Sequence, residues 1–150
     1  MATTTPPAIR AALEVTIAGL TCAGAAMGTG SYAVASGFEE WDDRNSGDVD
    51  RQFSIGSIDP EDVFEFGVTA EYALMSSMEI EIGHMKSGDV DAGRDRRDED
   101  VEQLMTELIS KGNYPAGVCL VEITGVDHAD YEEEFWITTI TFRLKHYRAT

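Results

Sequence analysis

The stretch MEIEIGHMKSGDVDAGRDRRDEDVEQLMTELI, residues 78–109, changes its hydrophobic spacing halfway along, and that change decides the fold class. In its first part apolar and acidic side chains alternate, which places Met78, Ile80 and Ile82 on one face of a strand. In its last part apolar side chains recur every three or four positions, as on one face of an α-helix. The apolar helix positions are Val101, Leu104, Met105, Leu108 and Ile109. The stretch therefore predicts a strand, a charged connection and a helix.

A second amphipathic helix is expected near the amino terminus, over residues 7–20. Ile9, Leu13 and Ile17 recur at the spacing of one helix face. The adjacent Pro6 suits a helix start, because the amide hydrogen that proline lacks would have no partner there. This helix precedes all of the predicted strands.

Short segments of β-forming residues predict the elements between the two helices. One strand is expected within residues 31–41, one at 51–57 and one at 63–72. Turns are expected at 42–50 and at Asp59–Pro60, where Asp, Asn, Gly and Pro gather. The strand of residues 78–85 then follows.

Two further strands are expected after the second helix, which Gly112 should end. They cover residues 117–125 and 135–147, around a polar turn at 126–133. The last strand is too long for one edge of a small sheet, so part of it is expected to project and pair with a neighbouring molecule.

This order of elements predicts one domain over residues 1–150 with an α+β fold. The expected architecture is a mostly antiparallel mixed sheet with two helices packed on one face. The chain has 150 residues, of which 43% are hydrophobic, so it can bury one core and has little room for a second.

The charge of the chain argues against binding to nucleic acid. The formal net charge is -17, which has the wrong sign for neutralising phosphates. Cys22 and Cys119 lie far apart without CxxC spacing, so both are interpreted as buried or incidental thiols. The first residues lack a basic leader, and a protein assembled in a cytoplasm is expected.

The charged connection contains a possible calcium loop. Asp89, Asp91 and Asp95 alternate as the first ligands of such a loop do. Arg94 stands where the loop requires glycine, and the shorter Asp100 stands where a bidentate glutamate is usual. A solvated loop with local ion pairs is therefore the preferred interpretation, and no metal or other cofactor is predicted.

The same acids can begin the helix, with Asp95 or Asp98 as its cap. That interpretation leaves the arginines of the connection, residues 86–97, unexplained. Arg94, Arg96 and Arg97 on a mobile loop would suit an acidic partner surface, for example another copy of this acidic chain.

No residue pattern supports catalysis. His84, His128 and His146 are scattered and are expected at the surface or at strand ends. No serine lies in a GxSxG context, and the glycines form neither a P-loop nor a GxGxxG motif. The sequence therefore predicts a protein that is not an enzyme.

The order of these elements resembles one family, the tail terminator (tail-completion) proteins of long-tailed bacteriophages. The amino-terminal amphipathic helix is the first feature that carries the resemblance. The others are RQFSI at 51–55, MEIEIGHM at 78–85, DEDVEQLMTELI at 98–109 and the closing hairpin of 117–147. The resemblance covers nearly the whole chain, and its specificity lies in the order and spacing of these phrases.

The resemblance implies a structural virion protein without a catalytic site. Such proteins form hexameric rings on the head-proximal end of the tail tube, stop its polymerisation and present the surface for head–tail joining. The implied partners are further copies of the chain, the tail tube protein and the head–tail connector or stopper. DNA would pass through the ring without specific binding, and no membrane is involved. The acidity would then let the duplex slide, or it simply confers solubility.

Contacts with ring neighbours or with the tube are expected from two basic regions, the connection and the end of the last strand. The candidate interface residues are Lys86, Arg94, Arg96, Arg97, Arg143, Lys145 and Arg148. Two alternatives stay open. One is another neck ring protein, such as a connector or stopper, and the other is a small calcium-binding module.

Overall fold

The computed structural model describes residues 3–24, 30–35, 41, 44, 49–65, 71–86, 89–131 and 134–149, with the backbone alone at 57–65, 71–72 and 148–149. Two α-helices, one short 3₁₀ helix and five strands follow one another along these residues. In chain order they are α1 (Pro6–Ala18), β1 (Ala33–Val34), β2 (Gln52–Glu65), β3 (Glu71–Met85), α3 (Val90–Ile109), η2 (Lys111–Asn113), β4 (Val118–Tyr131) and β5 (Phe135–Ala149).

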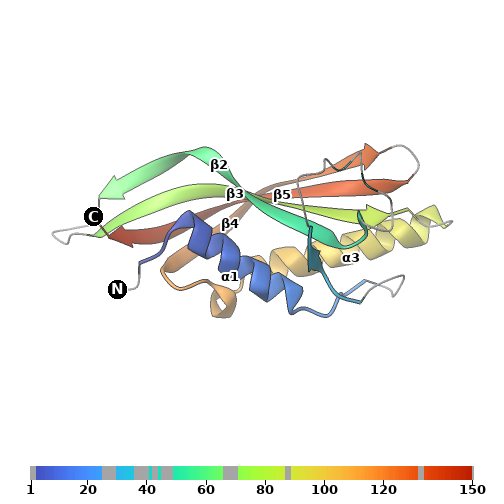
Figure 1. The fold of residues 1–150 in the computed structure, drawn as a ribbon, viewed down its shortest axis with the longest axis horizontal. Coiled ribbons are helices and arrows are strands. Elements are labelled where there is room, and N and C mark those ends of the chain that lie inside the picture. Colours follow the sequence, from blue (N-terminus) through green and yellow to red (C-terminus); the bar gives the residue numbers. More distant parts are fainter. Residues whose placement is uncertain are drawn as a thin grey trace.

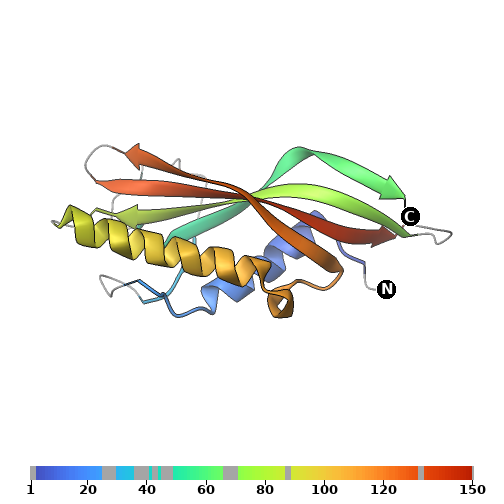
Figure 2. The same ribbon diagram turned by 180° about the vertical axis from the view of Figure 1, so that it is seen from behind.

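The five strands form one sheet in the order β1-β2-β3-β5-β4. β1 runs parallel to β2, and the other three pairs are antiparallel. The predicted α+β class with a mostly antiparallel mixed sheet is therefore confirmed. Figure 1 shows the long twisted sheet with α1 and α3 below it, and Figure 2 shows the same arrangement from behind.

β2 and β3 form one long hairpin where the sequence predicted separate strands. The pairing extends from Phe53 opposite Ile82 to Glu65 opposite Tyr72. The predicted strand at 63–72 is wrong, because it joins the end of β2 to the start of β3; residues 66–70 lie outside the described part. The predicted turn at Asp59–Pro60 is also wrong: β2 continues through it, with a register irregularity between Ile58 and Asp62. Proline fits in a strand at such an irregularity, because its missing N–H breaks no regular ladder there.

β4 and β5 form a second long hairpin. Val126 pairs with Ile140 and Tyr131 with Phe135, so the predicted turn at 126–133 is wrong over the part that belongs to β4. The polar sequence of this part reflects exposure on both faces of the strand, which removes the hydrophobic alternation that identifies strands.

β5 lies in the interior of the sheet. It pairs with β3 from Glu71 opposite Ala149 to Met85 opposite Phe135, and with β4 on its other side. The expectation that part of the last strand projects from the subunit is therefore wrong. Its 15 residues are matched by neighbours of 15 and 14 residues.

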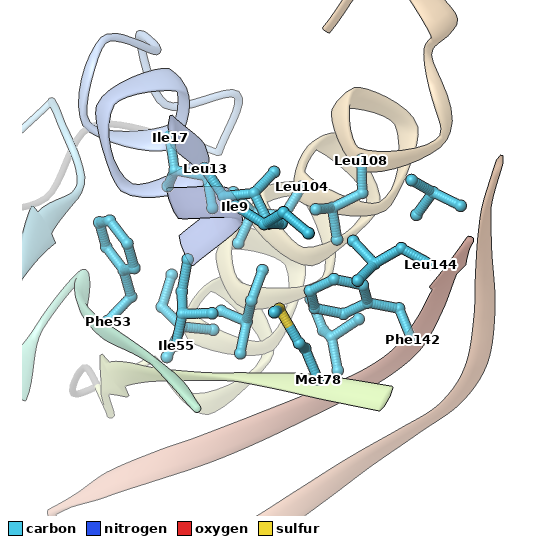
Figure 3. Packing of buried hydrophobic residues seen from close by; sticks show 14 of the residues in the cluster. Ile9, Leu13, Ile17, Phe53, Ile55, Met78, Leu104, Leu108, Phe142 and Leu144 are labelled. Atoms are coloured by element: carbon cyan, nitrogen blue, oxygen red, sulfur yellow. The ribbon is translucent and has the colours of Figure 1, made fainter. Parts of the chain in front are cut away.

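One hydrophobic core joins both helices to the sheet (Figure 3). α1 begins at the predicted prolines, is capped by Thr5 and buries the predicted stripe of Ile9, Leu13 and Ile17. The even-numbered residues at 78–82 of β3 and at 140–144 of β5 point to the same core. The buried members from the sheet and α3 are Phe53, Ile55, Met78, Ile80, Ile82, Val101, Leu104, Leu108, Val118, Val121, Ile140, Phe142 and Leu144.

Truncating a central core residue should destabilise the fold strongly. Phe142 is 0% exposed, so we expect Phe142→Ala to lower the free energy of unfolding by about 3–5 kcal/mol, through lost apolar burial and the cavity left behind. Val15 on α1 is 75% exposed, and Val15→Ala should change it by less than about 0.5 kcal/mol. Urea unfolding measures both. Similar losses in the two variants would contradict the central position of Phe142.

Candidate functional site

The helix α3 begins earlier than the sequence predicted. Its cap is Asp89, whose Oδ1 accepts hydrogen bonds from the backbone N–H groups of Asp91 at 3.1 Å and Ala92 at 3.2 Å. The predicted caps Asp95 and Asp98 lie within the helix instead. The loop predicted to reach Arg97 is therefore wrong, because the helix starts at Val90. Its arginines point in different directions from the helix surface.

Arg96 points inwards and forms a two-pronged ion pair with Asp50. Its Nη1 and Nη2 lie 2.7 and 2.8 Å from Oδ1 and Oδ2 of Asp50. The two side chains are 1% and 6% exposed. Burial alone would lower the pKa of Arg96, but the hydrogen bonds and charge of Asp50 raise it. The expectation of a free docking residue is therefore wrong for Arg96, whose charge is used inside the subunit.

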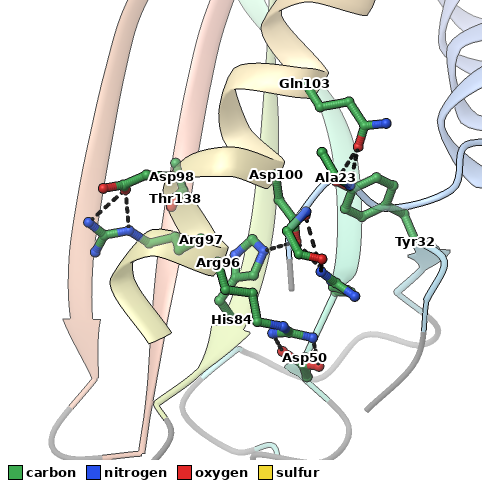
Figure 4. Close-up of polar contacts among 12 residues, drawn as sticks. Ala23, Tyr32, Asp50, His84, Arg96, Arg97, Asp98, Asp100, Gln103 and Thr138 are labelled. Atoms are coloured by element: carbon green, nitrogen blue, oxygen red, sulfur yellow. Dashed lines mark hydrogen bonds and ion pairs between the residues drawn. The ribbon is translucent and has the colours of Figure 1, made fainter. Parts of the chain in front are cut away.

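Asp100, one turn further along α3, joins three distant parts of the chain (Figure 4). Arg51 donates from Nε to Oδ2 at 2.8 Å and from Nη2 to Oδ1 at 3.1 Å. His84 Nε2 lies 2.8 Å from Oδ2, and the Gly24 N–H donates to Oδ1 at 2.8 Å. We call Gly24, Arg51, His84 and Asp100 the Asp100 network. Its side chains are at most 1% exposed.

Hydrogen bonding decides the charge state of Asp100. Burial alone would raise its pKa, because it disfavours the carboxylate. The hydrogen bonds from His84, Arg51 and Gly24 outweigh burial and lower the pKa to about 2. Asp100 is therefore ionised at neutral pH and balances the buried Arg51.

Two glycines allow the chain to approach closely enough for this network. A Cβ atom on Gly24 would lie 2.5 Å from the Arg96 carbonyl oxygen and 2.9 Å from Asp100 Oδ1. A Cβ atom on Gly83 would lie 2.3 Å from a methyl carbon of Val49. Both positions therefore require glycine. Gly24 lets the segment after α1 approach α3, and Gly83 lets the segment before β2 approach β3.

Arg51 has an unusual backbone conformation at the same junction. Its φ is 57°, which is unfavourable for a residue with a side chain. Its N–H donates to the Gly83 carbonyl at 2.7 Å, and its carbonyl accepts from Ala33 N–H at 3.0 Å. These bonds and the ion pair with Asp100 hold this conformation, which directs the guanidinium beneath α3.

The network is packed and has the character of a structural clamp. A surface groove over α3 is lined by Ala23, Glu99, Glu102, Gln103, Thr106 and Glu107, none of which belongs to it. In the described part of the chain, no group of three or more His, Cys, Asp or Glu side chains is placed to hold a metal ion. Asp89, Asp91 and Asp95 therefore form no metal-binding group, and Asp89 already serves as a helix cap.

The histidines are placed differently from the prediction. His84 and His146 are both 0% exposed, so a surface position is wrong for them, but each lies near the end of its strand as the other part of the prediction had it. His146 Nε2 lies 2.7 Å from Ser76 Oγ, whereas the more exposed His128 contacts Thr138 at 2.8 Å. A sequence signal for burial existed: His84 continues the alternation of Met78, Ile80 and Ile82, and His146 that of β5.

The two cysteines differ in their surroundings. Both cysteines are free, with Cys22 half-buried and Cys119 exposed. Burial raises the pKa of Cys22, which disfavours the reactive thiolate. Cys119 Sγ donates weakly to the Lys145 carbonyl at 3.4 Å.

The structure brings two of the candidate interface residues together. Lys86 Nζ and Arg97 Cζ lie 5.3 and 4.8 Å from the centre of the Trp136 ring. Lys86 also pairs with Asp130. These contacts join the start of α3 to the β4–β5 hairpin. Arg94 is the most exposed of the three helix arginines, at 58%, with Asp91 3.9 Å away.

Two other candidates, Arg143 and Lys145, lie on the sheet face opposite the core. Arg143 donates to Glu122 of β4 at 2.6 Å, and Lys145 follows it on the same face of β5. Arg148 lies in β5, and its side chain is outside the described part. The predicted residues are thus distributed over separate regions and do not form one basic patch.

The face opposite the core, which we call the Glu79 face, combines polar and acidic side chains with a second hydrophobic cluster, in which Phe135 and Ile137 of β5 are buried with Val49 and Trp41 packs against them. Trp41 Nε1 also donates to Glu81. This face carries Glu79 and Glu81 of β3, opposite Thr141 and Thr139 of β5. Burial and the neighbouring Glu81 both raise the pKa of Glu79. The prediction that the two glutamates oppose the apolar face of this strand is confirmed, since Met78, Ile80 and Ile82 are 0% exposed.

Comparison with known proteins adds no family: no protein-family model matches this sequence, and no curated protein matches it. In the described part of the chain, no helix is long and apolar enough to cross a membrane.

Removing Arg96 should destabilise the protein far more than removing Arg94. Arg96→Met leaves Asp50 buried without its counter-charge, and we expect a loss of about 3–5 kcal/mol in the free energy of unfolding. Arg94→Met, at an exposed position two residues earlier, should change it by less than about 0.5 kcal/mol. Denaturant titration of both variants tests this. Comparable losses would show that the buried pair contributes no more than a surface charge.

The contribution of Asp100 should disappear in acid. Its folded-state pKa of about 2 lies below its ordinary value of 3.8, so the stabilisation is present above about pH 4 and is lost as the pH falls towards 2. The unfolding free energies of the native protein and of Asp100→Asn should therefore converge by about 2 kcal/mol over that range. Asp91→Asn, at a side chain that is 92% exposed, controls for the loss of one negative charge. A pH-independent difference would contradict the prediction.

Proposed function

We propose that this protein is a structural subunit of a phage tail neck, the tail terminator that caps the head-proximal end of the tail tube. The observation that carries the proposal is the middle of the Glu79 face. Its central strands have 15 residues each, about 50 Å of extended chain, and beyond the cluster of Val49, Phe135 and Ile137 they present half-buried or exposed polar side chains such as Glu79, Thr141 and Arg143. A strand surface of this kind suits the wall of a channel better than a site for a small ligand.

The charge of this face fits the passage of DNA. Glu79, Glu81 and Glu122 lie on it, and the chain as a whole has a formal charge of -17. Phosphate groups are repelled by such a surface, so a duplex would pass without binding. Arg143 is paired with Glu122, which limits its attraction for phosphate.

The proposed assembly is a homo-oligomeric ring, with six subunits as the resemblance implies. Its partners would be the tail tube protein on one side and a head–tail connector or stopper on the other. This role requires no catalytic residue, and its place would be the neck of the virion, assembled in the host cytoplasm. Arg94 is the best placed of the helix arginines to contact another protein, since Arg96 is buried and Arg97 lies against Trp136.

Particles assembled without this protein should have defective tails. We expect electron microscopy to show tubes that are overlong or ragged at the head-proximal end, because nothing would stop tube polymerisation. Supplying the native protein should restore tube length, whereas the charge-reversed Arg94→Glu variant should restore it less well, because Arg94 is the helix arginine best placed to contact another protein. Normal free tails beside heads that leak DNA would contradict the terminator role and favour a stopper.

A further inference from the structure

We propose that the outer edge of β4 pairs with the outer edge of β2 in a second copy of this chain, so that neighbouring subunits share one continuous antiparallel sheet. This inference rests on the proposed ring and assigns its subunit interface.

β4 is an open edge strand. It is the last strand in the sheet order, so only β5 pairs with it among the described residues. Residues 124–128 are all exposed, and Val126 is 41% exposed. A strand exposed on both faces and along one edge buries little apolar surface in the isolated subunit. A subunit on its own therefore gains little from extending this strand to 14 residues.

The ladder geometry identifies which groups point outwards. Thr124 Oγ1 donates to the Thr141 carbonyl at 3.1 Å, so that carbonyl is directed towards β4. Gly125, opposite Thr141, is then a hydrogen-bonded partner in the antiparallel ladder. Because hydrogen-bonded and non-bonded pairs alternate, the backbone groups of Val126, His128 and Asp130 point away from β5.

An independent contact supports this assignment. Val121 lies opposite Leu144, an even-numbered residue of β5 like the partners of Val126 and His128. Its N–H points outwards, because it donates to the hydroxyl of Tyr114 at 3.3 Å. Tyr114 thus covers the edge at one point near the start of β4, while the later outward groups have no partner strand in the described part.

β4 has no bulge, lysine or proline over its second half. Natural edge strands are commonly protected by bulges, proline or charged side chains, especially lysine. The register irregularities of β4 lie between Val118 and Leu120 and between Ile123 and Gly125. From Gly125 to Tyr131 the pairing is regular over about 23 Å, and the charged side chains of this run are Asp127 and Asp130, of which Asp130 is paired with Lys86.

The opposite edge of the same sheet supplies the matching partner. β1 pairs only with Gln52 and Phe53, so β2 has no further partner strand on that side among the described residues. Phe53 directs its carbonyl outwards, to the N–H of Ala35 at 2.7 Å, so the backbone of Ser57 also points outwards by alternation. β2, like β4, has 14 residues.

Strand direction favours a head-to-tail arrangement. β4 runs antiparallel to β2 within one subunit, because three antiparallel pairings separate them. A copy rotated about an axis along the strands therefore places its β2 antiparallel to β4. This contact uses both edges of every subunit and can close into a ring. A two-fold pairing of β4 with β4 would use one edge only and would stop at a dimer.

Hydrogen exchange of the full chain tests the contact directly. We expect the amides of Val126, His128, Asp130 and Ser57 to exchange rapidly in the monomer and at least about tenfold more slowly in the oligomer or in the tube-bound ring. Asp127 should be protected in both states, because its amide bonds to β5. The exchange is compared on the native chain, so the result does not depend on any variant folding.

A proline substitution supplies a second readout. Val126→Pro removes one outward N–H and leaves the neighbouring bonds to β5, so it should raise the concentration for half-assembly by about tenfold or more. Val126→Ala keeps that N–H and is the matched control, with assembly expected as in the native chain. Equal assembly by the two variants, both folded by circular dichroism, would overturn the β4 contact.

The possible failures are distinguishable. A ring whose β4 amides exchange as fast as those of the monomer overturns the edge pairing and leaves the proposed ring intact. A dimer with β4 protected and Ser57 open overturns the head-to-tail arrangement. A chain that stays monomeric at every concentration and on isolated tail tubes overturns the proposed ring and the edge pairing together.

Discussion

The hydrogen bonds and ion pairs of Asp100 determine how the parts of this protein are held together. A hydrophobic core holds α1 and α3 near the sheet, but apolar burial has little directionality. Asp100 accepts hydrogen bonds from Gly24, Arg51 and His84, which belong to three segments outside α3. Together with the pair between Arg96 and Asp50, it sets the position of α3 along the sheet. Burying these charges is costly, and the ion pairs and hydrogen bonds among them offset that cost.

Elements with a hydrophobic period could be predicted from the sequence. The alternation of Met78, Ile80 and Ile82 identified the inner face of β3, and the spacing of Val101, Leu104 and Leu108 identified the buried side of α3. The second half of β4 could not be found in this way, because it is exposed on both faces and shows no alternation. The start of α3 was misplaced for a related reason: its first turns are charged, so they lack an apolar stripe.

The buried ionic residues could not be assigned to partners from the sequence. Asp50 lies 46 positions before Arg96, and Gly24 lies 76 positions before Asp100. An arginine or aspartate in a charged stretch is usually exposed, so nothing local distinguishes Arg96 from its neighbour Arg97. His84 was the exception, because its position in the alternation of β3 indicated the inner face. The candidate interface residues were found by composition, and composition does not report the direction of a side chain.

The Asp100 network also has a consequence for how this sequence can change. Gly24, Arg51, His84 and Asp100 each satisfy a group that another member leaves buried, so the effect of replacing one depends on the state of the others. Such positions are expected to be epistatic: a substitution that is harmful alone becomes tolerable once its partner has changed. Divergent copies of this fold should therefore retain the four residues as a unit or exchange them together for an apolar set. Exposed positions such as Val15, which is 75% exposed, are free to drift one at a time.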